Sequence, residues 1–208
     1  TETYGTGNLY LGDGPIRDAE VAAALYFGAS DCFFLTGGST QGIMAMLATA
    51  VGKGGSVLLD RECHKSVCHA CALLDITPYF VSAPLIEPFA VSGELPKDAV
   101  ERALLDHPDV KAVLVTSPTY YGVRRALPEL ADLCRAYGKS LLVDAAHGAH
   151  FPTVGLPAPI AEGADMAVLS MHKTLPCLGQ GAVVLCGAGV DKRALRENTA
   201  LFGTSSPS

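Results

Sequence analysis

The chain has 208 residues, of which 49% are hydrophobic and 17% charged, and its formal net charge is −6. This balance is typical of a folded globular protein and excludes a disordered one. No lysine- and arginine-rich block occurs and no apolar run is long enough to cross a bilayer, so we expect neither a nucleic-acid nor a membrane partner. Seven irregularly spaced cysteines favour reduced thiols in the cytoplasm over a disulfide framework.

Short apolar runs alternate with longer amphipathic segments along the chain. The apolar runs predict strands at 32–36, 56–60, 77–81, 110–116, 140–144, 165–169 and 182–186. Helices are predicted at 18–28, 40–51, 65–75, 96–106, 127–137 and 190–198. This alternation predicts an α/β fold with a doubly wound, mostly parallel sheet flanked by helices. Sites in such sheets form at the carboxyl ends of strands, so the residues that follow each strand are the functional candidates.

The first predicted strand is followed by Gly37-Gly38-Ser39-Thr40-Gln41-Gly42, which runs into a helix. Small residues, hydroxyls and a helix N-terminus form a site of the size of a phosphate. Serine and threonine are also the usual helix caps, and the motif taken alone favours that simpler interpretation.

Two charged residues follow later strands. Asp144 ends the strand in "LLVDAAHGAH", where an acid is either a functional carboxylate or a cap of the next turn. Lys173 follows the apolar strand at 165–169 and stands beside His172. Lysine is seldom buried, and desolvation lowers its pKa and frees the amine as a nucleophile. The alternative is a surface lysine in a turn, which the apolar residues around 175–178 disfavour.

The stretch "ECHKSVCHAC" at 62–71 holds three cysteines and two histidines. If 65–75 is a helix, His64, Cys68 and Cys71 share one face, so a three-ligand zinc site is conceivable. No second cysteine pair follows, and free cysteine also packs as a small apolar residue.

One chemistry accounts for the residues after the strands. A lysine for a Schiff base, a carboxylate for a pyridinium nitrogen and a hydroxyl-rich phosphate cradle are what pyridoxal 5′-phosphate requires.

Six segments then carry a resemblance to a known family. They are "FFLTGGST", "VLLDRECHKSV", "VLVTSPTYYGV", "LLVDAAHGAH", "SMHKTLPCLGQGA" and the terminal "TSSPS". In this order they cover nearly the whole chain, which resembles the Orn/Lys/Arg decarboxylases, pyridoxal-phosphate enzymes with the aspartate-aminotransferase fold. The resemblance implies that the chain is a single large domain over 1–208, truncated at both ends and lacking a C-terminal small domain.

The resemblance implies roles for residues around the cofactor ring. Lys173 would bind the cofactor as a Schiff base, and Asp144 would pair with the ring nitrogen. His64 would stack on one face of the ring and Ala146 on the other, with His147 near the ring hydroxyl. His64 is therefore expected to be a stacking residue, with Cys68 and Cys71 as packing residues, and no metal site is expected.

Further roles follow from the same resemblance. The phosphate would be held by Gly38, Ser39, Thr40, Ser170 and His172. Lys173 or His172 would help to protonate the reacting carbon, and Thr119 and Tyr120 would line the site at a third strand end. The chain departs from the family pattern at Gln41, which replaces a phosphate-loop hydroxyl with an amide, and at Ala145 and Tyr121, which stand where acids are common.

The implied activity is decarboxylation of lysine, arginine or ornithine to an amine, such as a diamine or agmatine, and carbon dioxide, as in polyamine metabolism. A homodimer with a shared active site is also implied, in which the tail at 203–208 reaches the partner's phosphate site. Two alternatives stay open: another pyridoxal-phosphate reaction (aminotransferase, aldolase or β-lyase), or a catalytically silent cofactor-binding fragment.

Overall fold

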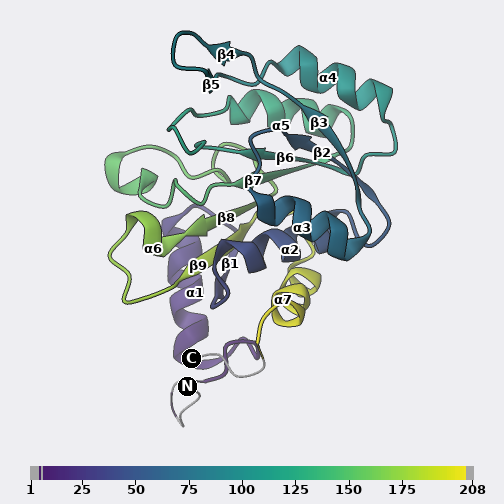
Figure 1. Cartoon of the computed structure of the whole chain (residues 1–208). Coiled ribbons are helices and arrows are strands. Elements are labelled where there is room, and N and C mark those ends of the chain that lie inside the picture. The colour runs from purple at the N-terminus through teal and green to yellow at the C-terminus, as the bar shows by residue number, and fades with distance from the viewer. Residues whose placement is uncertain (1–4, 6, 205–208) are drawn as a thin grey trace.

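A seven-stranded sheet forms the centre of the molecule in the computed structural model, which describes residue 5 and residues 7–204. Its order is β1-β9-β8-β7-β6-β2-β3 (Figure 1). The strands are β1 (Asp31–Leu35), β2 (Ser56–Asp60), β3 (Thr77–Val81), β6 (Ala112–Thr116), β7 (Ser140–Asp144), β8 (Met166–Ser170) and β9 (Ala182–Cys186). The pairs β3/β2, β2/β6, β6/β7 and β7/β8 are parallel, and β9 runs antiparallel to both β1 and β8.

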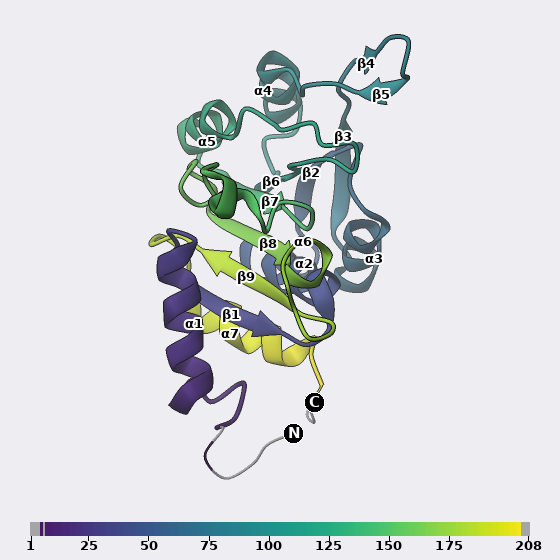
Figure 2. The same ribbon diagram turned by 90° about the vertical axis from the view of Figure 1, so that its left-hand side faces the viewer.

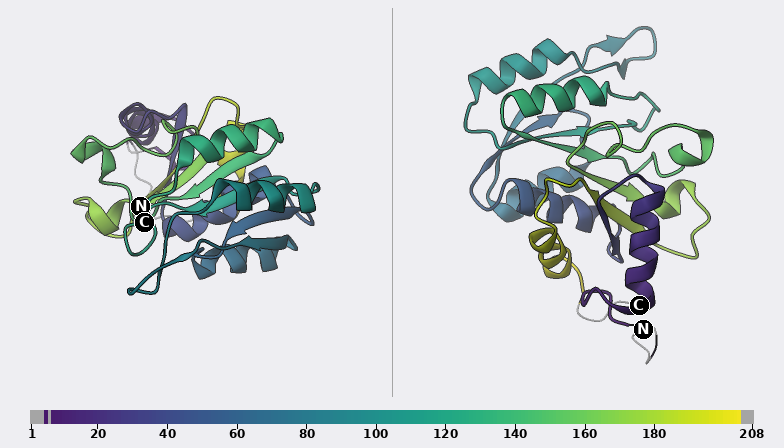
Figure 3. Two further views of the ribbon diagram at one scale, coloured as in Figure 1. Left: turned by 90° about the horizontal axis from the view of Figure 1, so that it is seen from above. Right: turned by 180° about the vertical axis from the view of Figure 1, so that it is seen from behind.

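Helices cover both faces of the sheet. The longer ones are α1 (Gly14–Tyr26), α2 (Gly38–Ala50), α3 (Lys65–Leu74), α4 (Lys97–Asp106), α5 (Leu127–Ala136) and α7 (Lys192–Leu201). One buried cluster joins the sheet to α1, α4 and α5, and a second joins the other face to α2, α3 and α7. Figure 2 shows α1 and α7 on opposite sides of β1, and Figure 3 shows α4 beside α5.

The predicted fold class is confirmed, as are all seven strands and six helices, to within a few residues at their ends. The continuously apolar runs are buried because both faces of the sheet are covered; β2, β6, β8 and β9 have no exposed residue. Helix α4 begins after Pro96 with Asp98 in its first turn, as its sequence indicates.

Four short elements were not predicted. They are the hairpin strands β4 (Leu85–Ile86) and β5 (Val91–Ser92), the 3₁₀ helix Phe151–Val154, and α6 (Met171–Thr174). Elements of two to four residues are too short to show a hydrophobic period. Within the part of the chain described here, no helix is long and apolar enough to span a membrane. Of the tail at 203–208, expected to reach a partner subunit, residues 205–208 lie outside the described residues.

Candidate active site

A pocket of about 130 Å³ lies at the carboxyl edge of the parallel strands. Its walls come from the start of α2, the ends of β2, β6 and β7 with their following loops, and α6 after β8. The lining residues are Ser39, Glu62, His64, Thr116, Tyr120, Asp144, Ala146, His147 and Lys173. Seven of these nine were predicted, although they are scattered between positions 39 and 173, because neighbouring parallel strands bring their following loops together.

Asp144 ends β7 between Thr116 of β6 and Val168 of β8. The residue is only 3% exposed, and the Ala146 N–H donates a hydrogen bond of 3.1 Å to its Oδ1. Burial raises the pKa of the Asp144 carboxyl, while the Ala146 N–H and the nearby charge of Lys173 act in the opposite direction. A cation placed against this carboxylate would offset the cost of burying it.

Lys173 lies on α6, and its Nζ is 3.3 Å from Nε2 of His147. The expectation of a buried lysine is wrong for the single chain: Lys173 is exposed, as are His172 and Thr174 beside it. The reason is the shape of this segment. The four-residue helix α6 leads into an exposed loop at 176–180, so nothing in the described chain covers the amine.

His147 lies between Lys173 and the ring of Tyr120, whose centroid is 5.8 Å away in an edge-on arrangement. Burial lowers the pKa of His147 below its ordinary 6.5, and the charge of Lys173 lowers it further, against the opposing effect of Asp144. The imidazole is therefore neutral at pH 7. A neutral Nε2 can accept a hydrogen bond from the Lys173 ammonium group, so this contact fixes the two nitrogens relative to each other.

His64 precedes α3 and is its N-cap. Its Nδ1 accepts a hydrogen bond from the Ser66 N–H at 3.2 Å and lies 2.8 Å from the Ser66 hydroxyl. Because Nδ1 accepts from the backbone, the neutral ring carries its proton on Nε2. The cap thus fixes the orientation of a ring that lines the pocket.

The glycine loop before α2 has an organisation that the sequence did not indicate. The Gly37 N–H donates to Oε1 of Gln41 at 2.8 Å, and Nε2 of Gln41 donates to the Thr199 carbonyl of α7 at 2.7 Å. Gln41 is buried and lines no part of the pocket, and its amide joins the loop to α7. Gly38 has a φ of +69°, a conformation that favours glycine.

The remaining predicted residues lie around the pocket without lining it. They are Gly38, Thr40, Thr119, Ser170 and His172. The Ser170 hydroxyl, at the end of β8, is buried and has no hydrogen-bond partner among the described residues. His172, expected at the phosphate, has its Nδ1 2.7 Å from the Gly181 carbonyl. The Thr119 hydroxyl accepts the Val123 N–H at 3.1 Å, which closes the turn after β6.

Two lining residues, Glu62 and Thr116, were missed. Both stand at or just after the ends of predicted strands, which is the signal that would have found them. They contact each other, since the Thr116 hydroxyl donates to the Glu62 carbonyl at 3.3 Å. Glu62 is the second acidic residue of the lining, beside Asp144.

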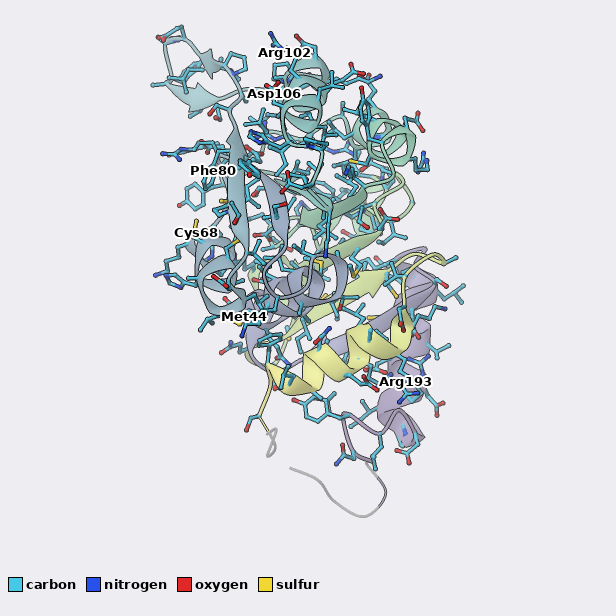
Figure 4. All side chains as sticks on the ribbon, turned by 90° about the vertical axis from the view of Figure 1, so that its right-hand side faces the viewer. Met44, Cys68, Phe80, Arg102, Asp106 and Arg193 are labelled. Carbon is cyan, nitrogen blue, oxygen red and sulfur yellow. The ribbon has the colours of Figure 1, made fainter. Side chains whose placement is uncertain are left out.

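The cysteine- and histidine-rich stretch does not form a metal cluster. No group of three or more histidine, cysteine or acidic side chains among the residues of the described ranges is arranged to hold a metal ion. Burial raises the pKa of Cys63 to about 12, with Cys68 beside it, and raises that of Cys71 to about 11. Figure 4 shows Cys68 on α3, at the same side of the molecule as Phe80 of β3.

Fold and site together define an α/β protein with the transferase-like fold, whose site holds a lysine, an aspartate and two histidines at the carboxyl edge of the sheet. The structure of lysine decarboxylase A from Pseudomonas aeruginosa has this fold: it superposes with a TM-score of 0.85 at 23% identity, over 99% of this chain and 31% of that one. The chain belongs to the Orn/Lys/Arg decarboxylase family, whose major-domain profile matches residues 1–208.

Two relatives support this membership. The uncharacterized protein YaaO of Bacillus subtilis (strain 168) is 35% identical over 100% of this chain and 44% of its own length. The arginine decarboxylase of Halalkalibacterium halodurans is 37% identical over 85% of this chain and 36% of its own length. The chain therefore spans less than half the length of these curated relatives.

Proposed function

We propose that the chain forms the cofactor-binding part of a pyridoxal-phosphate-dependent decarboxylase of a basic amino acid: lysine, arginine or ornithine. The observation that carries this proposal is the pocket in which the Lys173 amine, neutral His147 and the buried Asp144 carboxylate meet. Arginine and lysine decarboxylases among the relatives support the same activity.

The residues present fit pyridoxal phosphate. Asp144 is a buried carboxylate with one donor, suited to a protonated ring nitrogen. At the start of α2, Ser39 lines the pocket, and its backbone lies where a helix N-terminus attracts phosphate. The unpartnered hydroxyl of Ser170 offers a further donor nearby, next in the chain to α6, on which Lys173 lies.

When bound, the cofactor supplies an electron sink for the bond that breaks at the amino acid's α-carbon. Asp144 keeps a proton on the ring nitrogen, because its own charge is stabilised by that proton. The His64 ring, held by its cap contact to Ser66, would contact the cofactor and exclude water from that face. His147 accepts a hydrogen bond from Nζ of Lys173, which holds the amine at the pocket. Glu62 is exposed at the pocket wall, and its negative charge there would favour a cationic substrate.

The test uses the intact protein with added pyridoxal phosphate and with lysine, arginine and ornithine in turn. We expect carbon dioxide and the matching amine from one of them, and an absorbance band of lysine-bound cofactor that Lys173→Ala removes and the exposed control Lys53→Ala keeps. Formation of a keto acid without release of carbon dioxide would show that the reaction is transamination and not decarboxylation. A cofactor band without any product would support a silent binding module.

We further propose that the intact protein is a homodimer in a reducing, cytoplasmic compartment. All seven cysteines are free thiols, which suits that compartment. The loop after Lys173 carries Leu178, which is fully exposed. Beside it lies an apolar groove of about 620 Å³, lined among others by Tyr26, Phe34, Met171, Leu175, Pro176 and Val183. Contact with a second copy would cover these surfaces and the exposed Lys173.

A further inference from the structure

An ion pair between Asp60 and Arg125 lies completely buried next to the pocket. Both side chains have 0% exposure. Nε and Nη2 of Arg125 donate to the same Asp60 oxygen, Oδ2, at 3.0 and 2.7 Å. The third guanidinium nitrogen, Nη1, donates to the Gly93 carbonyl. The guanidinium of Arg125 is thus held on two sides by oxygen acceptors.

This pair joins three segments that are far apart in the sequence. Asp60 ends β2, Gly93 follows the β4–β5 hairpin, and Arg125 precedes α5. The Arg125 backbone N–H also donates to the Ser117 hydroxyl at 3.1 Å, just after β6. Neither charged residue lines the pocket, so their effect on the site must pass through the loops that they hold.

The loop after β2 is the one that carries pocket residues. The free oxygen of Asp60, Oδ1, accepts the Glu62 N–H at 3.1 Å, and the Glu62 carbonyl accepts the Thr116 hydroxyl at 3.3 Å. Two residues further on, His64 caps α3 and lines the pocket. The buried pair therefore fixes the start of the segment 61–64 against the end of β6.

Stability alone gives a weak reason for such a pair. The free energy lost when two charges are removed from water is about as large as the free energy gained from their attraction. A protein with well-packed apolar residues of similar size in their place is often as stable or more stable. A forked guanidinium, by contrast, fixes distance and direction in a way that apolar packing does not.

We propose that Arg125 is a positioning residue, which with Asp60 sets the spacing of the loops after β2 and β6 and so the placement of Glu62 and His64. The part of this proposal that concerns catalysis rests on the proposed function. The placement of the loops does not depend on it.

The first experiment compares Arg125→Lys with Arg124→Lys in the intact protein. Arg124 is the adjacent residue, pairs with Glu162 at 2.8 Å nearer the surface, and lines no part of the pocket. Lysine keeps the charge and loses the fork. We expect Arg125→Lys to speed hydrogen exchange of the segment 61–64 and to weaken pyridoxal-phosphate binding about tenfold or more, because small misplacements in a site are costly. Arg124→Lys should leave both unchanged.

The second experiment separates positioning from mere stability with the double variant Asp60→Leu/Arg125→Met. If the pair positions the loops, this variant regains the thermal midpoint of the wild type but still binds pyridoxal phosphate about tenfold more weakly, with a shifted pH profile of the bound cofactor's absorbance. Recovery of both stability and binding in the double variant would overturn the proposal. So would unchanged exchange at 61–64 in a folded Arg125→Lys. If the wild type binds no pyridoxal phosphate, the proposed function is wrong. The comparison of hydrogen exchange at 61–64 between Arg125→Lys and Arg124→Lys would still decide the role of Arg125.

Discussion

The carboxyl group of Asp144 is buried at the end of β7 with one backbone donor, while its cationic neighbour Lys173 is exposed. An acid that ends an apolar strand was visible in the sequence, and so was the lysine. One cofactor was expected to join them, but the exposure of Lys173 was not expected, because it depends on how much of α6 is covered. The contact between Lys173 and His147 likewise joins residues 26 positions apart.

Asp144→Asn should stabilise the cofactor-free protein at pH 7 and weaken cofactor binding. Burial raises the pKa of Asp144 in the folded state, so the folded state loses stability as pH rises from the ordinary value of 3.8 through that raised value. The cost of the buried charge is therefore present above the ordinary value, and asparagine removes it. We expect a gain of about 0.5–2 kcal/mol in the free energy of unfolding, which disappears as the pH approaches 3.8.

Thermal unfolding across this pH range measures the effect. Asp106→Asn, on the surface of α4 (Figure 4), is the control and should show no such trend. A loss of stability in Asp144→Asn at pH 7 would contradict the stated cost of burial.

Lys173→Met should raise the pKa of His147. The charge of Lys173 is the second cause, after burial, that lowers this pKa below 6.5, and methionine removes the charge while keeping a similar length. The pH titration of the His147 ring proton by NMR measures the change, with the resonance identified by its loss in His147→Gln. Lys53→Met removes a distant lysine and should leave the titration of His147 unchanged. If Lys173→Met also leaves it unchanged, the charge of Lys173 does not act on His147.

At the scale of elements, most of the fold follows from hydrophobic pattern. The predicted strands at 56–60, 77–81, 140–144 and 182–186 match β2, β3, β7 and β9 residue for residue, because short apolar runs flanked by polar residues or glycine predict strands well. The organisation of the glycine loop, by contrast, was not predicted. Gln41 bonds to Thr199 of α7, which is 158 residues away, and no local pattern reports that the two helices touch.

His64 links an element to the site, since it both caps α3 and lines the pocket. His64→Ala should lose the cap and cost about 1 kcal/mol of stability, whereas His64→Asn keeps a side-chain acceptor and should cost little. Both variants remove the ring, so both should weaken pyridoxal-phosphate binding alike. Urea unfolding and cofactor titration check the two effects; equal binding by His64→Asn and wild type would argue against a stacking role.

At the scale of the molecule, the single chain leaves the pocket open beside Lys173 and Leu178 exposed. If a second copy covers this region, Leu178→Glu should weaken the dimer by about 2 kcal/mol, since a charge would enter an apolar contact. Sedimentation velocity over a range of concentrations of the intact protein measures the dissociation constant. Leu105→Glu changes an equally apolar, exposed residue of α4 and serves as the control. The same association in both variants would place the dimer contact elsewhere.

The sequence by itself determined the α/β architecture, because apolar periods specify strands and helices, and it determined most of the pocket, because residues that follow parallel strands meet at one edge. The tertiary structure decided which residues distant in the sequence are in contact and which side chains are buried. It placed Glu62 and Thr116 in the pocket lining, and it paired the Gln41 side chain with the backbone groups of Gly37 and Thr199. It also left Lys173 exposed and buried Asp60 against Arg125. Each of these involves partners far apart in the chain, and burial and contact are properties of the packed chain that no local stretch of sequence contains.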